Sequence, residues 1–403
     1  MPVLADAAYR RLWAARTVSQ WGDIAQFTAL ALLVFHLTHS GIGVSGMVIA
    51  EILPVLLLAP LAGPLVDRLP RVTVMIGADI ARIVLATVLA AWHGNFPAVY
   101  AVAFGLSAGA VFFNPAANSL LPALVKEDQL VAANSAIWSA AVLSQVVLAP
   151  LAGVLTATAG YAWAFAVNAA SFAISAVLLA GLRAREAPRP MTIAPLLAQA
   201  REAASLLVRD RLLRALAVAQ TLAALSAGAT SALLVVLAVR RLHTSGGGYG
   251  LLLGAIAAGA FTGPVVLARL PALARRPAVV FVAFGLRGLV DLVLASVMAL
   301  PAALAALAGY GIGTSTGNVT FATVIQSHVA DRMRGRVFSA FDLIWQSLRL
   351  ASLLLGGLLA DAAGIRAVYY TGGALLAAAA LAGLTLAGSA AITAASQHQA
   401  GTA

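Results

Sequence analysis

Charged side chains are scarce in this sequence, and nine of them stand inside long apolar runs instead of between the runs. An ionised group in such a run is costly to bury, so it usually has a function or a partner of opposite charge. The chemistry open to these groups is proton transfer, binding of an ionic substrate or mutual neutralisation. They are Arg16, Asp23, Glu51, Asp79, Arg82, Arg287, Asp291, Asp342 and Arg349.

Asp23 is the strongest candidate for carrying a proton. No basic residue stands within one helical turn of it, and Arg16, Gln20 and Phe27 share its helix face. A polar stripe at mid-depth of an apolar helix predicts an aqueous cavity along that face. We therefore expect Asp23 to carry a proton or to bind a cationic substrate, with a buried structural hydrogen bond as the alternative.

Glu51 and Asp342 are two further candidates for proton coupling. Glu51 is followed by Pro54 in its apolar run, and an interfacial carboxylate is the alternative interpretation. Asp342, Gln346 and Arg349 fall on one helix face at i, i+4 and i+7. Arg349 is therefore expected either to balance Asp342 or to bind an anionic group.

Two pairs of opposite charge stand at helical spacing. Asp79 precedes Arg82 by three residues, and Arg287 precedes Asp291 by four. Side chains at these spacings meet on one helix face, so each pair can neutralise itself. We expect both to be structural ion pairs inside the membrane.

The composition indicates which elements must position these groups. Hydrophobic residues make up 62% of the 403 residues, charged residues only 10%, and the mean hydropathy is +0.96. Apolar runs of about 20 residues are long enough to span a bilayer as helices. We expect an all-α membrane protein with twelve such helices, at about 12–36, 44–66, 72–92, 97–121, 130–157, 161–182, 212–239, 248–270, 278–300, 302–327, 336–360 and 366–388.

The net charge of +11 predicts an orientation in the membrane. Eighteen of the 25 Lys and Arg residues lie in alternate loops, and basic residues stay on the cytoplasmic side during insertion. Both termini are therefore expected in the cytoplasm of a bacterial cell, and the positive charge does not indicate binding of nucleic acid.

The chain divides at its longest polar interruption. We expect a six-helix bundle over 1–182, a cytoplasmic linker over 183–211, a second six-helix bundle over 212–388 and a disordered tail over 389–403. A shift of 204 residues places Asn114 on Asn318 and Gly153 on Gly357, which indicates a weak parallel repeat of the two bundles.

The segment 63–71 reads Gly-Pro-Leu-Val-Asp-Arg-Leu-Pro-Arg and lies between the second and third runs. With twelve helices in two halves, it resembles the major facilitator superfamily. The resemblance implies that Asp67 meets the start of the eleventh helix and latches the two halves in the outward-facing state. A loop that only sets topology is the alternative. The predicted gating residues are Gly63, Asp67, Arg68, Arg71 and Arg336.

Three segments resemble the drug:proton antiporter branch of that superfamily, which contains macrolide efflux proteins and the enterobactin exporter. They cover residues 9–23, 67–82 and 331–337. This resemblance implies export of amphipathic drugs or a natural product by alternating access in exchange for protons, and thus a role in multidrug resistance. A narrow siderophore exporter and metabolite uptake by proton symport are the alternatives.

Polar residues in other runs are expected to complete the substrate cavity, although interhelical hydrogen bonding is their other possible role. With Gln20, Phe27, Gln346 and Arg349, they are Asn114, Asn118, Gln145, Gln220, Tyr310, Thr314 and Asn318.

Other classes of function lack their residues. Cysteine is absent, so thiolate metal sites and thiol catalysis are excluded, and no Gly-x-x-x-x-Gly-Lys phosphate loop precedes the only lysine, Lys126. No clustered acid, base or metal ligands indicate an enzyme. We expect a monomer in membrane lipid that needs a small-molecule substrate and protons but no cofactor or metal.

Overall fold

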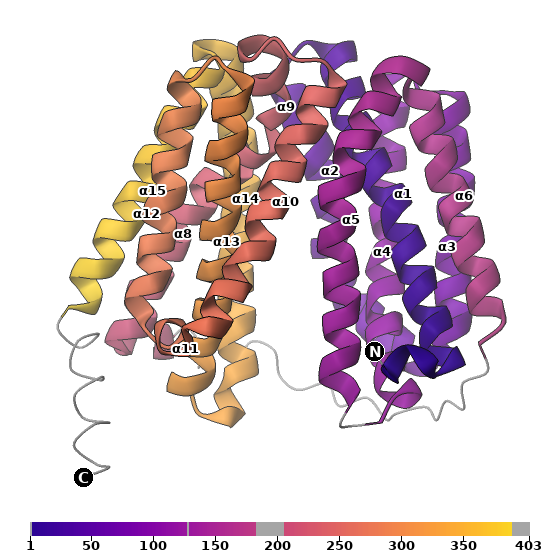
Figure 1. The fold of residues 1–403 in the computed structure, drawn as a ribbon, viewed down its shortest axis with the longest axis horizontal. Coiled ribbons are helices and arrows are strands. Elements are labelled where there is room, and N and C mark those ends of the chain that lie inside the picture. Colours follow the sequence, from indigo (N-terminus) through magenta and orange to yellow (C-terminus); the bar gives the residue numbers. More distant parts are fainter. Residues whose placement is uncertain (1, 127–128, 183–204, 389–403) are drawn as a thin grey trace. The chain divides into compact units, whose positions relative to one another are not determined.

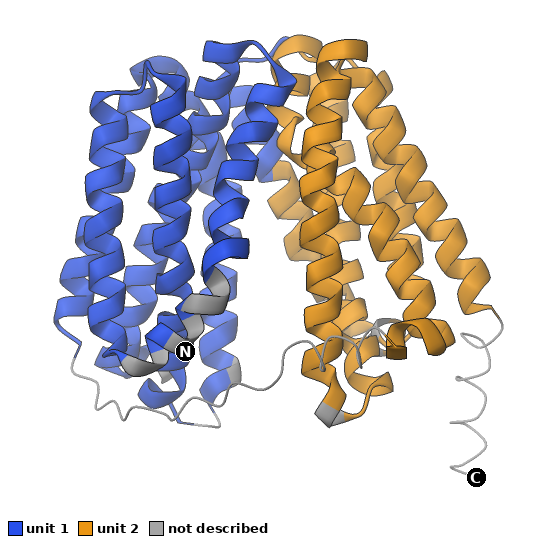
Figure 2. Cartoon of the chain, turned by 180° about the vertical axis from the view of Figure 1, so that it is seen from behind, with its two compact units in different colours: residues 1–192, 243–254 blue, residues 193–242, 255–403 orange. Residues whose placement is uncertain are grey.

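The computed structural model describes residues 2–126, 129–182 and 205–388, and within these ranges the regular structure is entirely helical (Figure 1). Residues 183–204 of the predicted linker and the predicted tail 389–403 lie outside the described residues. The chain forms two compact units, one of residues 1–192 with 243–254 and one of residues 193–242 with 255–403 (Figure 2).

Six long helices build unit 1, after a short 3₁₀ turn, η1, at Pro2–Ala5. Helix α1 packs against α5 and α6, α3 packs against α4 and α6, and α2 packs against α4. The helices are α1 Ala7–Thr38, α2 Gly41–Arg68, α3 Arg71–Ala91, α4 Phe96–Leu124, α5 Leu130–Ala159 and α6 Tyr161–Ala180.

Unit 2 repeats this packing. Helix α8 packs against α14 and α15, and α12 packs against α13 and α15. The elements are α8 Arg211–Ala232, α9 Leu234–Val236, η3 Leu237–Arg241, α10 Gly246–Arg269, α11 Pro271–Ala274, α12 Pro277–Ser296, α13 Leu300–His328, α14 Asp331–Ala363 and α15 Ile365–Ala387. The first residues of α10, up to Gly254, belong to unit 1.

The two units share an order of contacts along the chain. In each unit the first long helix packs on the fifth and sixth, and the third packs on the fourth and sixth. These five helices are α1, α3, α4, α5 and α6 in unit 1, and α8, α12, α13, α14 and α15 in unit 2. The repeat is therefore parallel, because the helices correspond in the same sequence order.

Eleven helices of the described residues are long and apolar enough to cross a membrane. The predicted span 302–327 corresponds to α13, which has 29 residues but does not reach the apolarity of the other eleven. Its Ser, Thr and Asn residues between Gly313 and Asn318 account for the difference.

The cores are made by apolar faces of these helices. In unit 1, buried Leu12, Met75, Phe113 and Leu179 join α1, α3, α4 and α6. In unit 2, a separate cluster that includes Phe281, Phe341 and Leu376 joins α12, α14 and α15 to α8. Each unit therefore has its own rigid framework on which polar side chains are held.

Candidate functional site

Unit 1 contains a cavity of about 360 Å³ whose wall combines charged, amide and aromatic side chains. Helix α1 contributes most of this wall, and α3, α4 and α5 complete it. The lining residues are Arg16, Ser19, Gln20, Asp23, Ile24, Phe27, Arg82, Ala110, Phe113, Asn114 and Gln145.

The predicted stripe on α1 lies along this cavity. Its residues stand three or four positions apart, and all of them line the cavity: Arg16, Gln20, Asp23 and Phe27. The side chain of Asp23 is exposed, whereas both of its sequence neighbours and the next turn of α1 are buried. Its exposed surface therefore faces the cavity.

Arg16 lies at the other end of the stripe. Its Nη1 donates a hydrogen bond of 2.8 Å to Oδ1 of Asn118 on α4. A guanidinium group has five N–H donors, so most of the hydrogen-bonding capacity of Arg16 is left for the cavity. Asn118 itself does not line the cavity but orients a residue that does.

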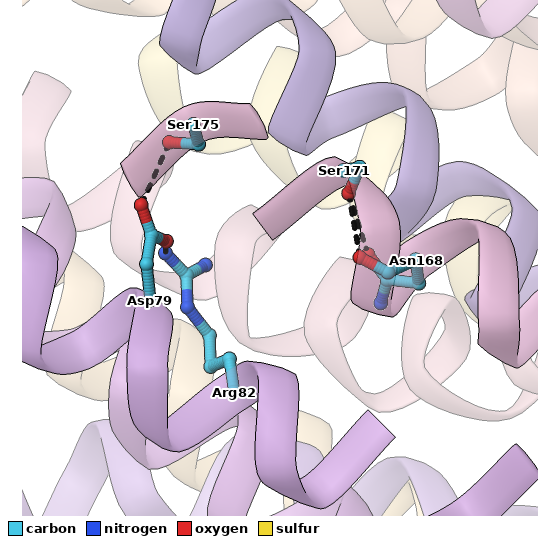
Figure 3. A network of polar contacts seen from close by, with 5 residues as sticks. All are labelled: Asp79, Arg82, Asn168, Ser171 and Ser175. Carbon is cyan, nitrogen blue, oxygen red and sulfur yellow. Dashed lines mark hydrogen bonds and ion pairs between the residues drawn. The ribbon is translucent and has the colours of Figure 1, made fainter. Parts of the chain in front are cut away.

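Arg82 is held from three sides. It forms an ion pair with Asp79, whose other oxygen accepts a 2.7 Å hydrogen bond from Oγ of Ser175 on α6 (Figure 3). The guanidinium carbon lies 4.3 Å from the ring centre of Phe172 and 4.6 Å from that of Phe113. Cation–π contacts with two rings and a carboxylate at the tip hold this side chain in place.

The fixed guanidinium retains unused donor capacity. Arg82 is only 3% exposed, and its buried Nε–H has no hydrogen-bond partner among the described residues. Arg82 also acts electrostatically on Asp23, and the side chain of Asn168 forms a hydrogen bond with Asp23. The carboxylates of Asp79 and Asp23 therefore both lie within the field of one guanidinium group.

Helix α6 supplies a polar seam that sequence reasoning missed. Nδ2 of Asn168 donates to Oε1 of Gln26 on α1 at 2.6 Å. Oγ of Ser171 donates to Oδ1 of Asn168 at 3.1 Å, as Figure 3 shows. Asn168, Ser171 and Ser175 stand at i, i+3 and i+7, so their common helix face was visible in the sequence. A side chain at Gly22 would collide with this seam, which explains the close packing of α1 and α6 there.

In unit 2 the predicted pair of Arg287 and Asp291 does not form an ion pair. Nη2 of Arg287 donates instead to the hydroxyl of Tyr310 on α13 at 2.8 Å, with its guanidinium carbon 4.8 Å from that ring centre. Asp291 has a long 3.5 Å contact with Oγ of Ser226 on α8. The aromatic ring of the neighbouring helix thus draws the guanidinium away from its own helix.

The other predicted residues are not among those that line the unit 1 cavity. Asp342 and Asn318 are exposed, and Gln220, Gln346 and Arg349 are half-buried. The hydroxyl of Thr314 donates to the carbonyl of Tyr310 within α13, and the carbonyl of Glu51 accepts from Ser107 on α4. A smaller cavity of about 170 Å³ in unit 2 is lined by residues of α8, α14 and α15, none of them a predicted site residue.

A family model described as Major Facilitator Superfamily matches residues 12–353, which is most of the chain. The chain belongs to this superfamily. With eleven described helices that are long and apolar enough to cross a membrane, it is a multi-pass membrane protein of this superfamily.

Several named members of the superfamily are similar to this facilitator. Macrolide efflux protein A of Streptococcus pyogenes is 33% identical over 123 residues, 30% of either chain. BacE of Bacillus subtilis, named as a bacilysin exporter, is 26% identical over 175 residues, 43% of either chain. The chain thus spans less than half the length of these curated relatives in the alignments.

The fold of this facilitator also has a solved counterpart. The crystal structure of a bacterial homologue of the iron transporter ferroportin, in an inward-facing state, superposes with a TM-score of 0.74. The comparison covers 94% of this chain and 98% of the other, at 18% sequence identity. At that identity the likeness establishes the fold alone.

The predicted gating segment lies at the end of a helix. Helix α2 continues through Arg68, and α3 begins at Arg71 after the connecting Leu69 and Pro70. The side chains of Asp67 and Arg68 lie outside the described residues. Arg336 on α14 donates from Nη1 to Sδ of Met333 at 3.6 Å, and the latch of this facilitator stays a prediction.

Proposed function

We propose that this facilitator exports amphipathic drugs or a natural product in exchange for protons. The observation that carries the proposal is Asp23, the one carboxylate among the residues that line the unit 1 cavity. An ionisable group that meets a water-accessible cavity inside an apolar bundle is where ion coupling is expected in a membrane transporter.

Exchange follows from competition at one carboxylate. Ionised Asp23 attracts a cationic group of the substrate, and protonated Asp23 does not. A proton entering from outside would therefore release the substrate, and loss of the proton to the cytoplasm would restore the binding site. The cycle needs no cofactor, because the proton gradient supplies the free energy.

The named relatives support the direction of transport. One is a macrolide efflux protein and another is named as a bacilysin exporter, and both names describe movement out of the cell. Glu51 and Asp342 remain secondary candidates for proton coupling, because neither lines the unit 1 cavity. We also propose that the transporter works as a monomer with both termini in the cytoplasm and that Asp67 and Arg336 form a cytoplasmic latch.

The proposal is tested by accumulation of fluorescent cationic and neutral drugs in efflux-deficient bacteria, with and without a protonophore. We expect cells that express the protein to accumulate less drug, and the protonophore to remove the difference. The Asp23→Asn variant should insert normally but lose this protonophore-sensitive export. Asp6→Asn on the same helix is the matched control, since Asn caps a helix as well as Asp does.

Three results would contradict this function. Higher accumulation in expressing cells would indicate uptake, and unchanged accumulation for every compound would indicate a narrow substrate such as a siderophore. Normal proton dependence in Asp23→Asn would reject Asp23 as the proton carrier.

A further inference from the structure

We propose that the substrate of the unit 1 cavity is amphoteric, with a cationic nitrogen that binds at Asp23 and an anionic group that binds at Arg16. The inference rests on the proposed function, because it takes this cavity as the substrate site. It adds the charge pattern and the approximate length of the substrate.

The cavity wall carries opposite charges at its two ends. At one end the ionised carboxylates of Asp23 and Asp79 share the single guanidinium of Arg82, which leaves a net charge of −1. At the other end Arg16 contributes +1, and its hydrogen-bond partner in the described structure is the neutral amide of Asn118. The wall is therefore dipolar, and a purely cationic molecule would meet repulsion at Arg16.

The two ends do not pair with each other among the described residues, where Arg16 bonds to Asn118 and forms no ion pair with Asp23. Asp23 follows Arg16 by seven residues, so their Cα atoms are about 10.5 Å apart along α1 at 1.5 Å per residue. Arg82 is held by its ion pair with Asp79 and by the rings of Phe113 and Phe172. One ligand that spans the distance between the two ends could therefore contact both Asp23 and Arg16.

The rest of the wall indicates what joins the two charged groups. Gln20, Asn114 and Gln145 offer amide donors and acceptors, and Phe27 and Phe113 offer aromatic surface. This combination suits a chain of amide bonds that carries apolar side groups. About 10 Å is the length of about three extended residues, and the volume of about 360 Å³ falls at the small end of ligand cavities.

The test is binding to the purified full-length transporter in detergent, measured by titration calorimetry. The probe is the tripeptide Phe-Ala-Phe, compared with its C-terminal amide, which is a cation, and its N-acetyl derivative, which is an anion. We expect the zwitterion to bind at least about tenfold more tightly than either derivative, which corresponds to about 1.4 kcal/mol.

Two variants assign the charged ends separately. Arg16→Gln should remove the preference for the tripeptide over its amide and leave the preference over the N-acetyl derivative. Asp23→Asn should do the reverse. The matched controls are Arg10→Gln and Asp6→Asn, which lie on or directly before α1 at exposed positions outside the cavity and should retain both preferences.

Equal binding of the three compounds, or binding of none of them up to millimolar concentration, would overturn the proposal. The same holds if Arg16→Gln and Asp23→Asn leave both preferences intact. Because binding in detergent requires neither a direction of transport nor a proton gradient, these results are independent of the accumulation assay. Export that depends on protons without any preference for zwitterions would reject this inference and keep the proposed function.

Discussion

The arrangement around Arg82 shows how this transporter keeps a charge inside an apolar bundle. Asp79 pairs with the tip of the side chain and is itself held by Ser175, and the rings of Phe113 and Phe172 lie against the guanidinium. Burying a charge is tolerable only with such partners, and removal of one partner leaves the other charge uncompensated. The site therefore contains one charged residue, Arg82, that is held in place. It contains another, Asp23, whose charge can change while these contacts of Arg82 remain.

Replacement of Asp79 tests this support. Asp79→Asn should destabilise the protein by about 3–5 kcal/mol, because it leaves the buried guanidinium of Arg82 without a carboxylate. Ser175→Ala removes only one hydrogen bond to a charged group and should cost about 1.5–3 kcal/mol. The measurement is the thermal midpoint of the purified variants in detergent. If Asp79→Asn were as stable as the wild type, Arg82 would have to be neutral or paired elsewhere.

Helix ends preserve the internal repeat better than helix interiors do. Asp6 caps α1 and Asp210 caps α8, each accepting a backbone N–H of the first turn, and the two residues are 204 positions apart. Gly160 between α5 and α6 has φ 84° and ψ 173°, and Gly364 between α14 and α15 has φ 83° and ψ 164°, again 204 positions apart. Only glycine adopts this backbone conformation readily.

At the N-terminus of α8, the Asp210 cap is also an ion pair. Its Oδ2 lies 2.9 Å from Nε2 of His328 at the end of α13, and Oδ1 accepts a 2.9 Å hydrogen bond from the backbone of Leu213. Partial burial raises the pKa of Asp210, but these hydrogen bonds and the charge of His328 outweigh it and lower the pKa below its ordinary value. Both side chains are partly exposed, so the pair is worth about 0.2–1 kcal/mol.

The lowered pKa of Asp210 gives a pH dependence with a defined sign. A carboxyl whose folded-state pKa is depressed stabilises the protein above its unfolded-state pKa of about 3.9, and this contribution is lost as pH falls through the lower value. Wild type should therefore have a higher thermal midpoint than Asp210→Asn at neutral pH, and the difference should begin to shrink below about pH 4 and vanish once the pH is below the lowered folded-state pKa. Because Asn caps helices equally well, the comparison isolates the charge. If the difference in thermal midpoint persisted unchanged in acid, its cause would be packing and not the charge of Asp210.

The helices could be predicted from the sequence because the pattern that indicates a membrane helix lies within one continuous segment. The runs of apolar residues determined the helices to within a few residues at most ends, and the stripe of α1 placed Arg16, Asp23 and Phe27 on one face of the cavity. Partners on other helices were beyond this reasoning. Arg287 contacts Tyr310, which is 23 residues away, and no spacing rule within a single helix predicts that choice.

At the scale of the whole molecule, the open question of most consequence is its orientation in the membrane. Eighteen of the 25 basic residues fall in the loops predicted to be cytoplasmic, and from this the positive-inside rule predicts that both termini are in the cytoplasm. The side of the membrane on which the proposed latch of Asp67 and Arg336 would form depends on this orientation.

The absence of cysteine from the chain makes the orientation directly measurable, since a single introduced Cys is the only thiol present. Leu69 between α2 and α3 and Gly94 between α3 and α4 are both exposed, and they lie at opposite ends of α3. In intact cells a membrane-impermeant maleimide should label Gly94→Cys at once and Leu69→Cys only after permeabilisation. The reverse pattern would place the Arg-rich loops outside, which would contradict the positive-inside assignment and the cytoplasmic position of the proposed latch.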